Sequence, residues 1–215
     1  MKNIALQMKI KKELKEFREF KKTYKFEYKS LRQQENGAIF CGDDCIKESD
    51  EAQLLGETEN FLNVGYGIHN AMSKLLSNLF PYQFYFRGLK LASIESFFQG
   101  IKFKNKKAQK LVFDYSGMPS NQIKMASDFD WQETQTIFFQ GKAYNRDSFE
   151  YDQLIDELYI SLLQNPLYRN AIKKVGKKQI IHSIGKEEKS ETVFTRFEFE
   201  FMLNCLKDFL LTKDK

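Results

Sequence analysis

The sequence contains little of what builds disulfide frameworks, metal centres or phosphate-binding loops. Its 215 residues include three Cys, two His, three Pro and one Trp. Cys41 and Cys45 have no second pair of ligands at zinc spacing, and three Cys cannot all pair, so we expect free thiols in a reducing compartment. The sequence has no G-x-x-x-x-G-K-[ST], no G-x-S-x-G and no H-E-x-x-H. We therefore expect a reaction that needs neither a metal nor a cofactor.

Long apolar runs are also missing. No stretch approaches the roughly 20 apolar residues that a membrane-spanning helix needs. The N-terminal residues are rich in Lys, and no long apolar block follows them, so they resemble no secretory signal. These absences predict a cytoplasmic protein with no membrane partner.

The positive charge of the chain is unevenly distributed. The formal net charge is +5. Residues 1–30 carry ten Lys or Arg against four Glu, a net charge of +6, which leaves residues 31–215 at −1. The basic character therefore belongs to the N-terminal segment.

The first 60 residues are expected to form an extension to the main domain. Residues 3–29 have the spacing of a charged helix with one apolar stripe. Its basic face could approach nucleic-acid phosphates, or its apolar stripe could pack on the main domain. Residues 36–60 are acidic and rich in turn residues, which indicates a connector. We therefore expect a basic helical extension with an acidic connector over 1–60 and the catalytic domain over 61–215.

Residues 61–215 have the dense apolar content of a packed domain. Residues 121–139 are expected to be helical. Ser93 is expected to be the N-cap of the helix that follows it. Asn165 with Pro166 is expected to begin another helix, which Gly176 ends. A helix over 148–163 is expected to begin at a capping box formed by Asp147 and Glu150. With several short strands between the helices, the fold class is α+β, mostly helical with a small β-sheet.

The stretch from Ser93 to Phe103 is the most informative part of the sequence. If it forms one helix, Glu95, Gln99 and Lys102 lie on one face, because i, i+4 and i+7 return to the same side. The surrounding positions are apolar, so the polar stripe should face a cleft within a buried helix. A carboxylate, an amide and an amine in one cleft indicate a catalytic site. An ordinary satisfied ion pair is the structural alternative.

Several separated motifs follow one another in a fixed order. They are Leu76-Ser77-Asn78, Phe80-Pro81, Ser93-Ile94-Glu95, Phe98-Gln99, Lys102-Phe103, Trp131, Gln140-Gly141-Lys142, Asn145-Arg146-Asp147, Asn165-Pro166, His182-Ser183-Ile184-Gly185-Lys186 and Glu191-Thr192-Val193. Over about residues 61–211 they resemble the signature of the NADAR superfamily. That family includes N-glycosidases of riboflavin-biosynthesis intermediates and DNA-guanine ADP-ribosyl glycosidases, which reverse the action of DNA ADP-ribosyltransferase toxins.

The chain departs from the riboflavin branch of that family near its C-terminus. Those enzymes carry a Trp-Gly pair there, whereas this chain has His182-Ser183-Ile184-Gly185 and its single Trp elsewhere. This form is closer to relatives that handle ADP-ribose, including phage-encoded ones. The resemblance therefore implies a NADAR-like N-glycosidase whose partners are an ADP-ribose-containing substrate, ADP-ribosylated DNA, and functionally a DNA ADP-ribosyltransferase toxin.

The substrates of the family share a ribose whose anomeric carbon is bonded to an exocyclic amine. Such a glycosylamine can open to an imine, into which a lysine amine exchanges before water hydrolyses the enzyme imine. Lys102 is the candidate nucleophile, and Glu95 is the candidate acid and base. An apolar pocket favours the neutral amine that attacks. Alternatively, Glu95 activates water against an oxocarbenium-like centre, and Lys102 only contacts the substrate.

The resemblance also assigns residues that bind the substrate. Asn78 and Gln99 are expected to hydrogen-bond ribose hydroxyls. His182 and Ser183, at the end of a predicted strand, and Gly185 are expected to contact phosphate or ribose. A structural role for His182 at the end of a strand is the alternative.

Three further residues are assigned to the base and the pyrophosphate. Trp131 offers a ring face on which a base can stack, although a lone Trp beside aliphatic residues is often part of a core. Lys142 and Arg146 are expected to contact the pyrophosphate, with a solvated charge as the alternative for either.

The leading hypothesis is an N-glycosidase that removes ADP-ribose from a base, with guanine in DNA preferred, acting as an antitoxin or in phage counter-defence. A second hypothesis is hydrolysis of small phosphoribosylamine metabolites, as in the riboflavin branch. The third is a non-catalytic module that binds ADP-ribose or a nucleotide, for which variants of Glu95 and Lys102 would have no turnover to lose.

Overall fold

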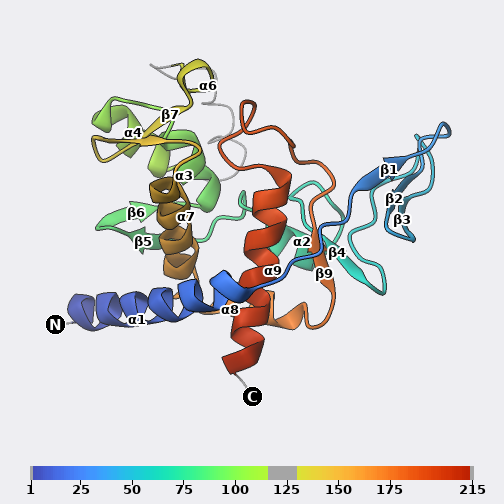
Figure 1. The fold of residues 1–215 in the computed structure, drawn as a ribbon, viewed down its shortest axis with the longest axis horizontal. Coiled ribbons are helices and arrows are strands. Elements are labelled where there is room, and N and C mark those ends of the chain that lie inside the picture. The colour runs from blue at the N-terminus through green and yellow to red at the C-terminus, as the bar shows by residue number, and fades with distance from the viewer. Residues whose placement is uncertain (1, 116–129, 214–215) are drawn as a thin grey trace.

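The computed structural model describes residues 2–115 and 130–213. Within them the helices are α1 (Lys2–Thr23), α2 (Ala71–Leu75), α3 (Ile94–Gly100), α4 (Lys106–Phe113), α6 (Trp131–Thr134), α7 (Phe149–Leu162), α8 (Pro166–Lys174) and α9 (Arg196–Lys213). The short strands that separate them pair in small sheets, so the expected α+β class is confirmed (Figure 1).

The strands form small sheets at different places in the molecule. An antiparallel sheet contains β1 (Leu31–Gln33), β2 (Ile39–Cys41) and β3 (Asp44–Lys47), a parallel pair contains β4 (Phe61–Asn63) and β9 (Gln179–Ile181), and two hairpins contain β5 (Phe84–Phe86) with β6 (Leu89–Leu91) and β7 (Thr136–Phe139) with β8 (Lys142–Asn145). The β1–β3 sheet projects at one end of the molecule, and the hairpins lie with α3 and α4 at the other (Figure 1).

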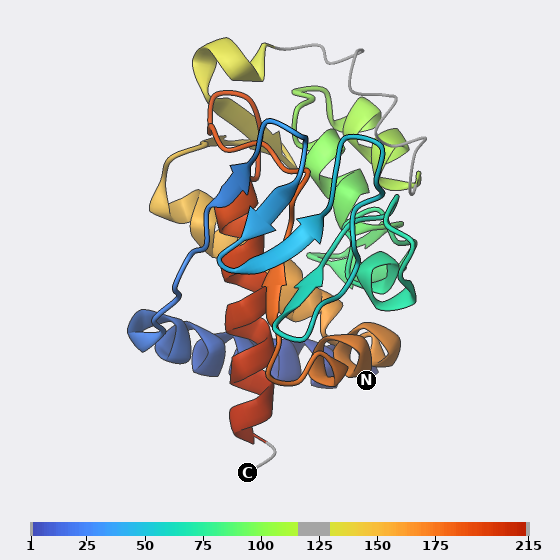
Figure 2. The same cartoon turned by 90° about the vertical axis from the view of Figure 1, so that its right-hand side faces the viewer.

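The main core is built around α7 and α9. Helix α9 runs through the middle of the molecule, and α1 lies across its lower half (Figure 2). Phe199, Leu203, Leu206 and Leu210 are all buried on α9. Their i, i+4, i+7 and i+11 spacing produces one continuous apolar stripe, which explains why the helix packs along its whole length.

Helix α1 packs on this core through its apolar stripe. Leu14 and Phe17 are buried, and the Phe17 ring meets Phe209 of α9 edge to face at 5.5 Å. Arg18 donates to the backbone oxygen of Gln153 in α7 at 2.9 Å. The structure therefore confirms the packed alternative for this helix, which ends at Thr23 rather than near residue 29. The domain boundary at residue 60 stays a prediction.

Two expectations about local structure were wrong. Residues 130–139 do not form one helix, because Gln135 has a positive φ of 49° after the short α6 and strand β7 follows. Gln140 and Gly141 both have positive φ and close the β7–β8 hairpin, as two-residue hairpin turns require. The expectation for 121–129 lies outside the described residues.

The second correction concerns the start of α7. Ser148, not Asp147, is the N-cap, and its hydroxyl accepts from the Tyr151 backbone amide at 3.2 Å. By contrast, Asn165 and Pro166 begin α8 as expected, and Gly176 follows its end with φ of +65°. None of the described helices is long and apolar enough to cross a membrane.

Candidate active site

A cavity of about 220 Å³ lies where α3 faces the start of α9 and the loop between β9 and α9. This loop folds over towards α3 at the upper end of the molecule (Figure 1). The residues that line the cavity are Asn78, Glu95, Phe98, Gln99, Lys102, His182, Gly185, Lys186, Glu191, Thr192, Val193, Phe194 and Phe199. The cavity therefore brings together six of the ten residues that the sequence predicted for the site.

Helix α3 carries the first two residues of the polar stripe, Glu95 and Gln99. Ser93 is its N-cap, as expected, and it exchanges hydrogen bonds with Ser96 in a capping box. These bonds satisfy backbone amides that the first turn leaves unpaired. Glu95 lies in this first turn, where the positive end of the helix dipole favours a carboxylate. The helix ends at Gly100, so Lys102 lies just beyond it rather than within it.

The three polar side chains form a hydrogen-bonded chain. Gln99 Nε2 donates to Glu95 Oε1 at 2.5 Å, and Lys102 Nζ donates to Gln99 Oε1 at 2.9 Å. Gln99 and Lys102 are each only 5% exposed. Because a lysine ammonium only donates and a carboxylate only accepts, the two partners fix the orientation of the amide. Each end of the Gln99 amide thus has a partner within the protein, and the expected contact of Gln99 with ribose stays a prediction.

Asn78 is held at the cavity from two sides. Its backbone oxygen accepts from the Glu95 amide at 2.9 Å, and its side-chain oxygen accepts from the Tyr159 hydroxyl at 2.8 Å. Tyr159 is fully buried on α7, and burial raises the pKa of its hydroxyl well above the usual value. The Tyr159 hydroxyl therefore stays neutral and donates. Because the Asn78 side-chain oxygen accepts this bond, the Asn78 amide nitrogen points away from Tyr159.

His182 follows β9 directly and enters the cavity as a neutral ring. Its Nδ1 lies 2.6 Å from the Val64 backbone oxygen, which can only accept, so Nδ1 carries the hydrogen and Nε2 is an acceptor. Burial lowers the pKa of His182, which also favours the neutral form. Behind it, Glu200 Oε1 accepts from the His182 backbone amide at 2.7 Å. Burial raises the pKa of Glu200 to about 7.

Ser183 and Gly185 lie on the same loop, but only Gly185 reaches the 220 Å³ cavity. Ser183 Oγ accepts from Asn63 Nδ2 at 2.8 Å and lines a second cavity of about 320 Å³ with Tyr28 and Arg196. Gly185 lines both cavities. A Cβ on Gly185 would lie 2.7 Å from the His182 ring, so this close approach needs glycine.

Arg146 holds the cavity wall in place from within the protein. It is 1% exposed and binds Glu198 through two hydrogen bonds of 2.9 and 2.5 Å, while its Nε donates to the Thr192 backbone oxygen at 3.2 Å. Burial alone would raise the pKa of Glu198, but the bonds from Arg146 outweigh it and the pKa is lowered. The guanidinium thus lies in a buried ion pair, away from the expected contact with pyrophosphate.

Trp131 and Lys142 also lie outside the cavity lining. Trp131 is 6% exposed and belongs to the main core, with its ring centroid 5.6 Å from Lys102 Nζ. The Trp131 ring therefore packs next to the candidate nucleophile. Lys142 is exposed on β8, where its Nζ lies 4.7 Å from the Tyr144 ring.

Sequence reasoning missed Tyr159, Phe194 and Glu200. Tyr159 and Glu200 lie in helices that amphipathic spacing identifies, but each contacts its partner across the fold, so no local signal marks it. Phe194 stacks on Phe98 at 5.0 Å and closes the apolar side of the cavity. It directly follows the Glu191-Thr192-Val193 motif, which was the one signal that could have pointed to it.

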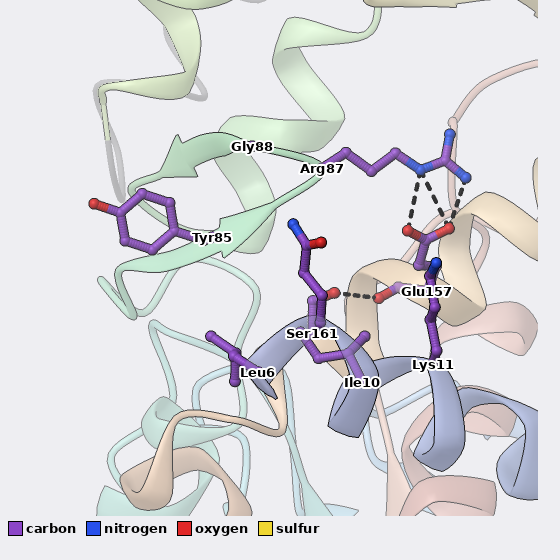
Figure 3. A pocket seen from close by; sticks show the side chains of 9 residues that line it. Leu6, Ile10, Lys11, Tyr85, Arg87, Gly88, Glu157 and Ser161 are labelled. Carbon is purple, nitrogen blue, oxygen red and sulfur yellow. Dashed lines mark hydrogen bonds and ion pairs between the residues drawn. The ribbon is translucent and has the colours of Figure 1, made fainter. Parts of the chain in front are cut away.

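A larger cavity of about 480 Å³ lies elsewhere, between α1, the β5–β6 hairpin and α7 (Figure 3). Leu6 and Ile10 form its apolar side. The charges of Arg87 and Glu157 are directed towards each other, with Arg87 Nη2 2.6 Å from Glu157 Oε2. Among the described residues, no group of His, Cys, Asp and Glu could hold a metal ion.

Residues 70–208 match the family model described as Bacteriophage protein GP30.3. An uncharacterised 17.1 kDa protein from the Gp30–rIII intergenic region of Enterobacteria phage T4 is 32% identical over 137 residues, which cover 63% of this chain and 90% of that protein. The NMR structure of the E. coli protein YbiA covers 74% of this chain and 89% of its own, with 13% identity and a TM-score of 0.48. Every residue that lines the 220 Å³ cavity falls within the matched range.

Proposed function

This chain belongs to the bacteriophage GP30.3 family, a NADAR-family domain, and we propose that it is an N-glycosidase that removes ADP-ribose from a modified base. The family relation points to a glycosidase-type enzyme. For the substrate, we propose ADP-ribosylated guanine in DNA. The reaction would let the protein act as an antitoxin, or as a counter-defence, against a DNA ADP-ribosyltransferase.

The observation that carries this proposal is the chain from Glu95 through Gln99 to Lys102 in one cavity. A carboxylate and an amine are held at opposite ends of one amide, beside an apolar wall that contains Phe98 and Phe194. Acid–base catalysis and amine nucleophilic catalysis need these two groups within reach of one substrate atom.

In the proposed reaction, a proton first passes from the Lys102 ammonium to the Glu95 carboxylate, which leaves a neutral amine and a carboxylic acid. Glu95 gives this proton to the ribose ring oxygen as the ring opens to an imine between the anomeric carbon and the base nitrogen. The neutral Lys102 amine adds to that carbon. A proton passes from the Lys102 nitrogen to the base nitrogen through Glu95, the bond between the carbon and the base nitrogen breaks, and the base leaves as an amine. Water adds to the resulting enzyme imine and releases ADP-ribose and free Lys102, so the net reaction consumes one water.

The size of the cavity favours a second candidate substrate. A volume of about 220 Å³ is below the roughly 300–1,000 Å³ typical of ligand pockets, which suits a small phosphoribosylamine. ADP-ribose would have to extend beyond this space. The adjoining 320 Å³ cavity shares Gly185 and offers one direction for that extension. Inhibition by ADP-ribose separates the two candidates, because only the first predicts strong competition.

The proposal is tested by incubating the protein with an oligonucleotide ADP-ribosylated on guanine, with and without borohydride. We expect release of ADP-ribose and a borohydride-trapped adduct on Lys102. Lys102→Ala should lose both, and Glu95→Gln should lower the rate by about 10²–10⁴. Lys174→Ala, which removes an exposed lysine of α8, is the matched control and should behave as wild type.

Two results would change the proposal. Release of ADP-ribose without a trapped adduct would keep the proposed substrate but change the mechanism. Water activated by Glu95 would then attack the anomeric carbon directly, with no Lys102 imine. No release from DNA, with release from a small ribosylamine, would move the function to the second candidate. Binding of ADP-ribose with no turnover on either substrate would leave only a binding module.

A further inference from the structure

Positive charge is concentrated in the part of the sequence that begins in helix α3 and continues through α4. Residues 96–113 contain five Lys and no Asp or Glu, although residues 31–215 together carry a net charge of −1. The first of these lysines, Lys102, lines the cavity. Three others are exposed on α4, and they are Lys106, Lys107 and Lys110. The buried side of the same helix is formed by Gln109, Val112 and Phe113.

The β7–β8 hairpin adds a fourth lysine to this face. A Cβ on Gly141 would lie 2.3 Å from Lys106 Cε, so the lysine side chain runs directly over the hairpin turn. Lys142 is the next residue and is exposed. We call Lys106, Lys107, Lys110 and Lys142 the lysine surface. Among the residues that the structure describes, none of the four forms an ion pair, whereas Lys21, Lys178 and Lys213 each do.

The stability of α4 does not explain these lysines. Lys106 and Lys107 occupy the first turn of the helix, which contains no acidic residue. The positive end of the helix dipole disfavours cations there. The same dipole adds to the attraction that the lysine ammonium groups exert on a nearby anion. Lysines in this turn therefore suit a partner with many negative charges better than they suit the isolated helix.

We propose that the lysine surface binds the phosphate backbone of the DNA strand that carries the modified base. This inference rests on the proposed function, because it assigns where the remainder of the substrate lies. Lysines are point charges that bind phosphates without reading sequence, so the surface would give affinity and orientation rather than sequence preference.

The surface is close enough to the cavity to act on the same strand. Lys102 and Lys106 are four residues apart, so their Cα atoms are separated by at most about 14 Å. One strand of duplex DNA advances about 3.4 Å per nucleotide. The first lysine of the surface therefore lies within about four nucleotides of the base that enters the cavity.

The test measures binding of a fluorescein-labelled, unmodified DNA duplex as salt is varied. The variant replaces Lys106, Lys107 and Lys110 together by Gln. The slope of log K against log salt should become shallower by about 0.9 for each phosphate that the variant no longer binds, so by about 2–3 in total. The matched control replaces Lys173 and Lys174 of α8 and Lys177, which follows this helix, by Gln. It removes the same charge and should leave the slope unchanged.

A kinetic comparison links the surface to the site. For the α4 variant we expect kcat/KM to fall at least tenfold on an ADP-ribosylated oligonucleotide, through KM, and to stay unchanged on an ADP-ribosylated mononucleotide. Complete absence of hydrolysis by wild type would overturn the proposed function while the salt slope still decides whether the surface binds DNA.

Three outcomes would overturn the inference. The α4 variant and the α8 control could have equal slopes, which would show that only net charge matters. Replacement of Lys9, Lys11 and Lys12 of α1 by Gln could instead make the slope of log K against log salt shallower, which would place the DNA on α1. Binding to an RNA duplex of the same sequence with no binding to DNA would reject DNA as the partner.

Discussion

Glu200 links proton binding to folding. It is 1% exposed, and burial raises its pKa from an ordinary 4.5 to about 7. The folded protein therefore keeps a proton that the unfolded chain releases between about pH 4.5 and 7. Because the native state binds more protons in this window, the free energy of unfolding falls as pH rises through it, by up to about 3 kcal/mol.

Glu200→Gln should remove this pH dependence. An amide oxygen can still accept from the His182 backbone amide, but it never ionises. We expect the variant to be more stable than wild type at pH 8 by about 1–3 kcal/mol and close to wild type at pH 5. Urea unfolding at pH 5, 6, 7 and 8 measures the difference between the two proteins.

A matched variant separates this effect from simple loss of charge. Glu188→Gln removes an exposed carboxylate from the loop before α9, and its stability difference from wild type should be within about 0.5 kcal/mol at every pH. If Glu200→Gln and wild type instead gave parallel curves, Glu200 would not be the group that titrates.

Gln99 offers a second prediction at this scale. Gln99→Glu would place a carboxylate opposite Glu95 Oε1, and two carboxylates that close together hold one proton between them. We expect turnover to fall at least tenfold and the pH–rate profile to move to higher pH. Gln99→Met keeps the shape without either hydrogen bond, so it should lower kcat without moving the profile. An unchanged kcat in both variants would show that the amide does not position the two groups.

Helix α1 is expected to contribute to stability although it lies outside the range matched by the family. Phe17 is fully buried against Phe209. Phe17→Ala should lower the free energy of unfolding by about 3–5 kcal/mol, because the cavity that forms cannot close fully. Met8→Ala, at a position 66% exposed on the same helix, should change it by less than about 0.5 kcal/mol. Equal effects of the two variants would mean that α1 is not part of the cooperative unit.

At the scale of elements, local sequence signals predicted the helix ends that depend on bonds between nearby residues. Ser93, Asn165 and Gly176 mark helix ends through bonds within a few residues, and the structure has all three in those roles. The helical spacing of Glu95 and Gln99 likewise brought them together. The β7–β8 hairpin was missed because its apolar run fits a buried helix as well as a strand.

At the scale of the whole molecule, the sequence could not show which polar groups pair with each other. Arg146 was expected at the substrate, but its partner Glu198 lies 52 residues away, and no periodicity reveals such a pairing. Trp131 was assigned to the base because its ring offers a face for stacking, but the ring is 6% exposed and belongs to the main core. The motifs identified most of the residues around the cavity, whereas long-range contacts determine which of those residues face it.

The pairing of β4 with β9 also limits when the candidate active site can form during synthesis. Phe61 pairs in parallel with Gln179, a residue made about 118 positions later. At translation rates of about 5–20 residues per second, β4 waits on the order of 6–24 s for its partner to leave the ribosome. The wall that contains His182 and Phe199 emerges later still. A nascent chain therefore carries Glu95 and Lys102 for several seconds before it has a cavity in which to use them.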